Sequence, residues 1–147
     1  MPAVAVTCIL LIAATTVIHY EVLRLLNARL PAMAIPQRTK LLVVIFAAFA
    51  AHALEIFLYG LALFALVTRL SVGTLSGPAV VSLLDCLYFS AETYTSLGFG
   101  DVVPVGPVRL LAGVETLNGL LLIGWSASYA YIAMERFWSG PPEDMGS

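Results

Sequence analysis

Charged side chains are scarce in this sequence. Lysine, arginine, aspartate and glutamate together make up 11% of it, whereas ordinary soluble domains carry about 25%. Hydrophobic residues reach 61%, and the mean hydropathy is +0.97. This composition excludes an ordinary soluble domain and predicts a single integral membrane domain in the lipid bilayer. The few basic residues form no run that would bind nucleic acid.

Other absences narrow the class further. The two cysteines, Cys8 and Cys86, lie inside apolar segments and match no metal-ligand spacing, so we expect free buried thiols. No segment repeats arginine at every third position, so no voltage sensor is expected. The sequence has no nucleotide-binding, calcium-loop or catalytic signature, and it therefore predicts neither an enzyme nor a cofactor.

Long apolar runs are what the sequence does have. Residues 3–26, 41–68 and 108–136 are each long enough to cross a hydrocarbon core of about 30 Å as a helix. Residues 79–93 are apolar but too short to span, and Ser76 or Gly77 is the expected cap of that helix. No basic residue precedes Arg24, which argues against a cleaved signal peptide. The fold class predicted is an all-α membrane protein.

Basic residues gather between the first two long runs. The linker 27–40 contains Pro31 and Pro36, which interrupt a helix. The basic side chains in or beside it are Arg24, Arg29, Arg38 and Lys40. The positive-inside rule assigns this linker to the cytoplasmic side of the cell membrane. The N-terminus is then expected outside and, after three crossings, the C-terminus inside.

The stretch from Thr95 to Asp101 reads Thr-Ser-Leu-Gly-Phe-Gly-Asp. Gly98 and Gly100 flank one aromatic residue, and glycine tolerates backbone angles that other residues avoid. Successive carbonyl oxygens can then point to one side, where a ring of them replaces the water around a cation. Thr95 and Ser96 add hydroxyl oxygens.

This stretch resembles the selectivity filter of the potassium channel superfamily, whose usual form is Thr-Thr-Val-Gly-Tyr-Gly-Asp. Ser96 and Phe99 resemble the filter of ether-a-go-go-type channels, which still select potassium. Leu97 replaces the usual valine. The resemblance spans residues 41–138 and includes three positions outside the filter. Glu92 corresponds to the pore-helix glutamate, Pro104 to a proline that follows the filter, and Gly119 to the inner-helix hinge glycine.

The resemblance implies an architecture. Three transmembrane helices, a re-entrant pore helix and a filter loop would assemble with three further copies into a C4 homotetramer. The implied segments are a pore domain (41–138) with outer helix 41–68, pore helix 79–93, filter 95–101 and inner helix 108–136. The apolar run before this domain adds an extra helix and linker (1–40), and the polar, proline-rich residues after it predict a disordered tail (139–147).

The resemblance also implies site residues. The ion-binding filter would be Thr95, Ser96, Leu97, Gly98, Phe99 and Gly100, with K⁺ as the permeant ion at the oxygens of Ser96, Leu97, Gly98 and Phe99. Glu92, Asp101 and Tyr94 would support it, and we expect Glu92 and Asp101 to share one proton. Leu120, Ile123 and Ala127 would line an apolar cavity near Gly119, which acts either as a hinge or as a close-packing point.

Four polar residues inside the long runs have open roles: His52, Glu55, Glu115 and Asn118. His52 and Glu55 share a helix face, either as a hydrogen-bonded lock or, with His19, as a metal or proton site. Glu115 is expected behind the filter, the alternative being a cation-concentrating ring at the pore.

Four functions are weighed. A passive potassium-selective channel leads, and a weakly selective Na⁺/K⁺ channel is the alternative that Leu97 and Phe99 favour. A membrane metal or redox protein would use His19, His52 and Glu55. A non-conducting subunit of a heteromer is the fourth. The sequence does not indicate the gating stimulus.

Overall fold

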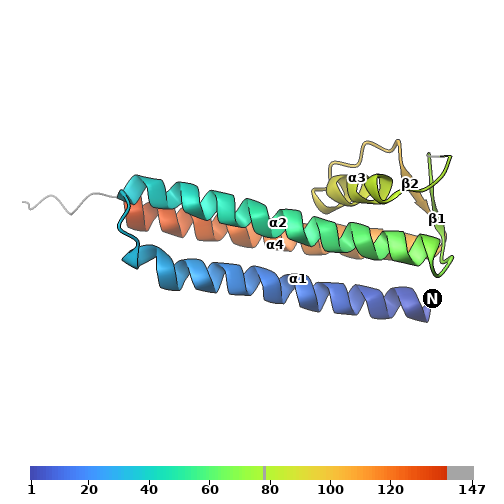
Figure 1. The fold of residues 1–147 in the computed structure, drawn as a ribbon, viewed down its shortest axis with the longest axis horizontal. Coiled ribbons are helices and arrows are strands. Elements are labelled where there is room, and N and C mark those ends of the chain that lie inside the picture. The colour runs from blue at the N-terminus through green and yellow to red at the C-terminus, as the bar shows by residue number, and fades with distance from the viewer. Residues whose placement is uncertain (78, 139–147) are drawn as a thin grey trace, which may run out of the picture.

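The computed structural model describes residues 1–77 and 79–138, and it is almost entirely helical. Figure 1 shows three long helices side by side, with a short helix and a small two-stranded sheet packed at one end. The long helices are α1 (Pro2–Arg29), α2 (Gln37–Thr68) and α4 (Val108–Trp138). All three are long and apolar enough to cross a membrane, which confirms the predicted spans.

The first two helices are longer than the sequence indicated. Only residues 33–36 interrupt regular helix in the expected linker, because a 3₁₀ turn, η1 (Leu30–Ala32), extends α1. Pro36 then precedes α2, whose first turn includes Arg38 and Lys40. The buried Lys40 ammonium donates to the Pro31 carbonyl at 3.1 Å and lies over the Phe137 ring, 5.2 Å from its centroid. This lysine therefore fastens the α1–α2 junction to the end of α4.

The short helix α3 (Leu83–Tyr94) begins four residues later than predicted. The expected cap at Ser76 or Gly77 was wrong, because Ser82 and Asp85 form a capping box. The Ser82 hydroxyl oxygen accepts from the Asp85 N–H at 3.2 Å, and the Asp85 carboxylate accepts from the Ser82 N–H at 2.8 Å. The Ser82 hydroxyl also donates to the Asp85 carboxylate at 2.6 Å, and this bond, together with the one from the Ser82 N–H, holds the pKa of Asp85 below its ordinary value.

A two-stranded antiparallel sheet lies beside α3 and was not predicted. Strand β1 (Thr74–Ser76) pairs antiparallel with β2 (Val103–Val105), so that Leu75 lies opposite Pro104. Leu75 is buried in the main apolar cluster, whereas the strand residues on either side of it are exposed. This small sheet thus joins the segment that leads into α3 to the segment that leads into α4.

Glycine lets α3 lie very close to both long helices behind it. A methyl group at Gly60 of α2 would approach Leu87 Cδ2 to 2.8 Å, and one at Gly119 of α4 would approach the Tyr94 carbonyl oxygen to 2.2 Å. At Gly60 the nearest atom is the end of the flexible Leu87 side chain, so a methyl group there would be tight but could be accommodated by a shift of that side chain. Real side-chain carbons do not come as near to a backbone oxygen as 2.2 Å, so Gly119 needs glycine. Of the two expected roles of Gly119, this supports close packing, and α4 continues through it as one helix.

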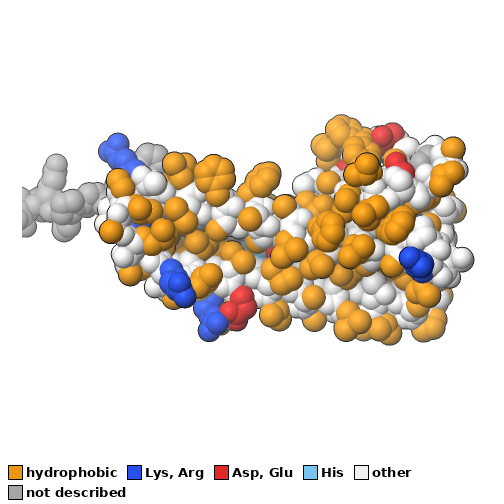
Figure 2. Space-filling model, viewed as in Figure 1, with side chains coloured by type: hydrophobic (Ala, Val, Ile, Leu, Met, Phe, Trp, Pro, Cys, Tyr) orange, Lys and Arg blue, Asp and Glu red, His pale blue; other side chains and the backbone are white. Residues whose placement is uncertain are grey.

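Charged side chains lie mainly at the two ends of the molecule (Figure 2), and hydrophobic side chains cover most of the visible face between them. Several basic side chains gather at the end where α1 turns into α2. Cys8 and Cys86 are buried and free, as predicted. The apolar outer surface and the three spanning helices indicate a membrane protein.

Candidate functional site: the loop after α3 and its supports

The loop that follows α3 starts as a helix C-cap of the Schellman type. The Ser96 N–H donates to the Thr93 carbonyl at 3.1 Å, and the Leu97 N–H donates to the Glu92 carbonyl at 2.8 Å. Ser96 has φ +60°, the left-handed conformation that this motif requires and that glycine usually supplies. The end of α3 therefore fixes the direction in which the loop leaves the helix.

Backbone handedness alternates along the loop. Ser96, Gly98 and Gly100 have φ values of +60°, +56° and +80°, whereas Leu97 and Phe99 are not among the residues with positive φ. Alternation of this kind turns successive peptide planes so that their carbonyl oxygens can face the same side. A methyl group at Gly98 or Gly100 would meet no atom within 4 Å, so φ rather than space requires glycine there.

Glu92 holds the middle of the loop from behind. Its side chain is buried, with 4% of the residue exposed, and Oε2 accepts from the Phe99 N–H at 3.1 Å. Asp101 has a different partner, because the Tyr88 hydroxyl donates to both its carboxylate oxygens at 3.0 and 3.2 Å. Partial desolvation and this bond to Asp101 raise the pKa of Tyr88.

The expected proton shared by Glu92 and Asp101 was therefore wrong for this structure. Among the described residues, no hydrogen bond joins the two carboxyl groups. The reason is that each already has a donor: a backbone N–H for Glu92 and a phenol for Asp101. Tyr88 was missed as a support, and its spacing of one helical turn from Glu92 was the available signal.

The residues expected to face a cavity lie on the open side of α4. Leu120 and Ala127 are exposed in the single chain, and Ile123 is half-buried. Ile123 borders a cavity of about 250 Å³ together with His52, Tyr94 and Thr95. This cavity lies directly beside the start of the loop.

Glu115 and Asn118 lie inside the chain and do not point outward. Glu115 is fully buried, and the Ser90 hydroxyl of α3 donates to its Oε1. Among the described residues, its Oε2 has no hydrogen-bond partner. Asn118 Nδ2 donates to Thr15 Oγ1 at 2.8 Å and to the Tyr59 hydroxyl at 3.1 Å. Glu115 thus contacts the back of α3, whereas Asn118 joins α4 to α1 and α2.

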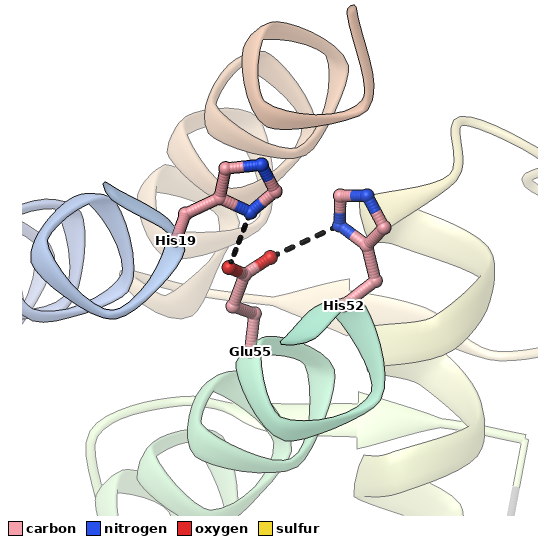
Figure 3. A group of neighbouring side chains, drawn as sticks. All are labelled: His19, His52 and Glu55. Carbon is pink, nitrogen blue, oxygen red and sulfur yellow. Dashed lines mark hydrogen bonds and ion pairs between the residues drawn. The ribbon is translucent and has the colours of Figure 1, made fainter. Parts of the chain in front are cut away.

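A cluster of three ionisable side chains lies inside the bundle (Figure 3). Glu55 lies between two histidines: its Oε1 is 2.9 Å from His19 Nδ1, and its Oε2 is 3.1 Å from His52 Nδ1. The Tyr94 hydroxyl donates to Glu55 Oε2. His19 and Glu55 are fully buried. The structure thus brings together the three residues that the sequence could only group as one alternative, and it adds Tyr94 to them.

Comparison with known proteins agrees with the geometry. A family model described as "Ion channel" matches residues 39–136, well over half of the chain. An inward rectifier potassium channel from Paramagnetospirillum magnetotacticum, Kirbac3.1, is 33% identical over 60 residues. That similarity covers 40% of this chain and 20% of the relative, so the match spans about a fifth of the relative's length. No solved structure shows a significant match. The chain belongs to this ion channel family, within the potassium channel superfamily.

Proposed function

We propose that the chain is one subunit of a passive, potassium-selective channel. The observation that carries the proposal is the loop Thr95–Gly100, in which positive φ values recur at every second residue from Ser96 to Gly100. Carbonyl oxygens directed to one side can replace the hydration shell of a desolvated cation. No chemical reaction is part of this function, so the protein is proposed as a non-enzyme without a cofactor.

A single loop gives oxygens on one side of an ion only, and a closed cage needs several copies. We take the assembly to be a C4 homotetramer with the loops around its axis. Leu97 and Phe99 are 58% and 67% exposed in the single chain, so both side chains are open to contact with a neighbouring copy.

The orientation follows from the charges. The basic side chains at the α1–α2 junction favour the cytoplasmic side, and the N-terminus and α3 lie at the opposite end of the bundle (Figure 1). The N-terminus is then outside and α3 enters from outside. Its carbonyl end points toward the membrane interior, where the helix dipole favours a waiting cation.

Conduction in this proposal is multi-ion transfer between carbonyl rings. K⁺ ions bind at the carbonyls of Ser96, Leu97, Gly98 and Phe99, aided by the Ser96 hydroxyl, and neighbouring ions displace one another. Below the loop, Leu120, Ile123 and Ala127 form an apolar cavity wall. Such a wall can close the path by losing its water.

The test is reversal potential in liposomes that contain only the purified chain. The expected reversal potential shifts with the K⁺ gradient by about 59 mV per tenfold change, the value for a selective monovalent conductance, and does not move with the Na⁺ gradient. The control is an equal amount of protein with Gly98→Ala, whose side chain opposes the φ of +56°. A wild-type reversal potential that ignores the K⁺ gradient would contradict the proposal.

A weakly selective cation channel is the second candidate. Phe99 has no hydroxyl with which to fix the loop from behind, so its side chain adds no hydrogen bond to the one that its N–H donates to Glu92. A less rigid carbonyl ring discriminates less between Na⁺ and K⁺. The Na⁺/K⁺ permeability ratio under bi-ionic conditions separates the two candidates, and a ratio near one favours the second.

A further inference from the structure

The cluster in Figure 3 joins α1, which carries His19, to α2, which carries His52 and Glu55. Hydrogen bonds to Tyr94 at the end of α3 and to Ser126 of α4 extend it to all four helices. One ligand atom from each of His19, His52 and Glu55 lies within 4.8 Å of the others. Carboxylates and imidazoles are rare and costly inside membrane helices, so such a concentration indicates a function.

We propose that His19, His52, Glu55 and Tyr94 form a binding site for a divalent transition metal of the zinc class. Imidazole nitrogens and a carboxylate are ordinary zinc ligands, and four ligands give the usual tetrahedral set. Tyr94 supplies the fourth, because its hydroxyl oxygen lies 3.0 Å from His52 Nδ1 and also bonds Glu55. The site offers too few oxygens for K⁺, Ca²⁺ or Mg²⁺, so it is distinct from the ion path.

Ser126 is the feature that favours a metal over a simple hydrogen-bonded lock. Its Oγ lies 3.1 Å from the Nε2 of both His19 and His52. When both Nδ1 atoms bind a metal, both Nε2 atoms carry protons, and one hydroxyl oxygen can accept both hydrogen bonds. Metal-bound histidines usually donate their other N–H to such an acceptor.

Without a metal the same ring lacks one proton. If both Nδ1–H groups donate to an ionised Glu55, both Nε2 atoms need a donor, and Ser126 has a single hydroxyl proton. The ring is then complete only if it holds one extra proton. A divalent ion displaces that proton and the phenolic proton of Tyr94, and both leave to water. The site is neutral before and after this exchange, which suits a low-dielectric interior.

Binding is therefore expected to weaken at acidic pH, because protons compete for the same atoms. Two further titratable side chains, Tyr59 and Glu115, lie close enough to Tyr94 to interact with it electrostatically. The 250 Å³ cavity lined by His52, Tyr94 and Thr95 gives a metal an access route. Since Tyr94 directly precedes Thr95, an occupied site would fasten the start of the candidate filter to α1 and α2.

The test is metal titration of the full chain, purified in detergent with a tag that contains no histidine. Co²⁺ is the first probe, because tetrahedral coordination gives strong visible absorption, and Zn²⁺ then competes for the site. We expect one metal per chain. We also expect release of about two protons per ion, measured in buffers of different ionisation enthalpy. Saturable binding should be more than about 100-fold weaker in His19→Gln and Glu55→Gln.

Two further variants complete the design. Ser126→Ala removes only the shared acceptor and should weaken binding by about 10- to 100-fold at unchanged stoichiometry. Glu21→Gln removes an exposed carboxylate of α1, which pairs with Arg24 at 2.6 Å, and should leave binding unchanged. Helical content and oligomer size show whether each variant folds. If Glu55→Gln fails to fold, the result for His19→Gln still decides the test.

The proposal is overturned if the wild type shows no saturable binding, or if His19→Gln binds as tightly as the wild type. Both readouts are independent of ion conduction. A protein that conducts K⁺ without binding metal, and one that binds metal without conducting, are therefore separable results.

Discussion

Replacement of Glu92 by alanine tests most sharply how the candidate filter is held. The carboxylate is almost fully buried, and it accepts the Phe99 N–H at 3.1 Å from behind the loop. Removal leaves that N–H without its partner. A hydrogen bond to a charged group contributes about 1.5–3 kcal/mol, so about 2 kcal/mol would shift each loop about 30-fold toward other conformations. A tetramer carries this loss in every subunit.

The assay is K⁺ flux into liposomes, normalised to tetramer content. Glu92→Ala should form tetramers but lose most flux or most K⁺/Na⁺ selectivity. Glu92→Gln keeps an acceptor oxygen and should show an intermediate effect. Asp85→Asn is the control on the same helix, because its carboxylate faces Ser82 instead of the loop. Wild-type flux and selectivity in Glu92→Ala tetramers would refute the reasoning.

Three further results are expected. Gly119→Ala should lower the melting temperature, because its methyl group would lie 2.2 Å from the Tyr94 carbonyl and overpacking costs about 1–3 kcal/mol; an unchanged melting temperature would contradict the close contact. Phe99→Tyr should raise K⁺ over Na⁺ permeability if the second candidate function holds, and should have little effect if the filter is already selective. The capping box of Asp85 should be lost as pH falls through a folded-state pKa below 3.8, since the ionised carboxylate is the acceptor. Melting temperatures of wild type and Asp85→Asn should therefore converge at low pH, and a constant difference would count against the capping box.

The spans and the loop were predictable because their signals are local. A helix that crosses the membrane needs a continuous apolar run, and composition alone reveals it. The spaced glycines Gly98 and Gly100 likewise report a backbone requirement at their own positions.

What sequence reasoning missed depends on contacts between distant residues. Ser82 was not chosen as a cap because Ser76 and Gly77 offered a plausible earlier start, and only the pairing of Ser82 with Asp85 decides between them. The β1–β2 sheet pairs two strands that are separated in the sequence by α3, so no local turn signal announces it. The contact of His19 with Glu55 spans 36 residues, so no spacing rule could assign the pair. The partner of Asp101 was wrongly predicted because Tyr88 and Glu92 lie on neighbouring turns, and packing selects between them.

Direct observation of ions is the most decisive measurement of the central claim. The claim is that backbone oxygens from Thr95 to Gly100 of several chains surround a dehydrated monovalent cation. A structure of the assembled protein in Tl⁺, a K⁺ substitute with strong anomalous scattering, should show a row of density on a fourfold axis beside these carbonyls. A monomer or dimer, or loops that face lipid with no ion density between them, would contradict the account.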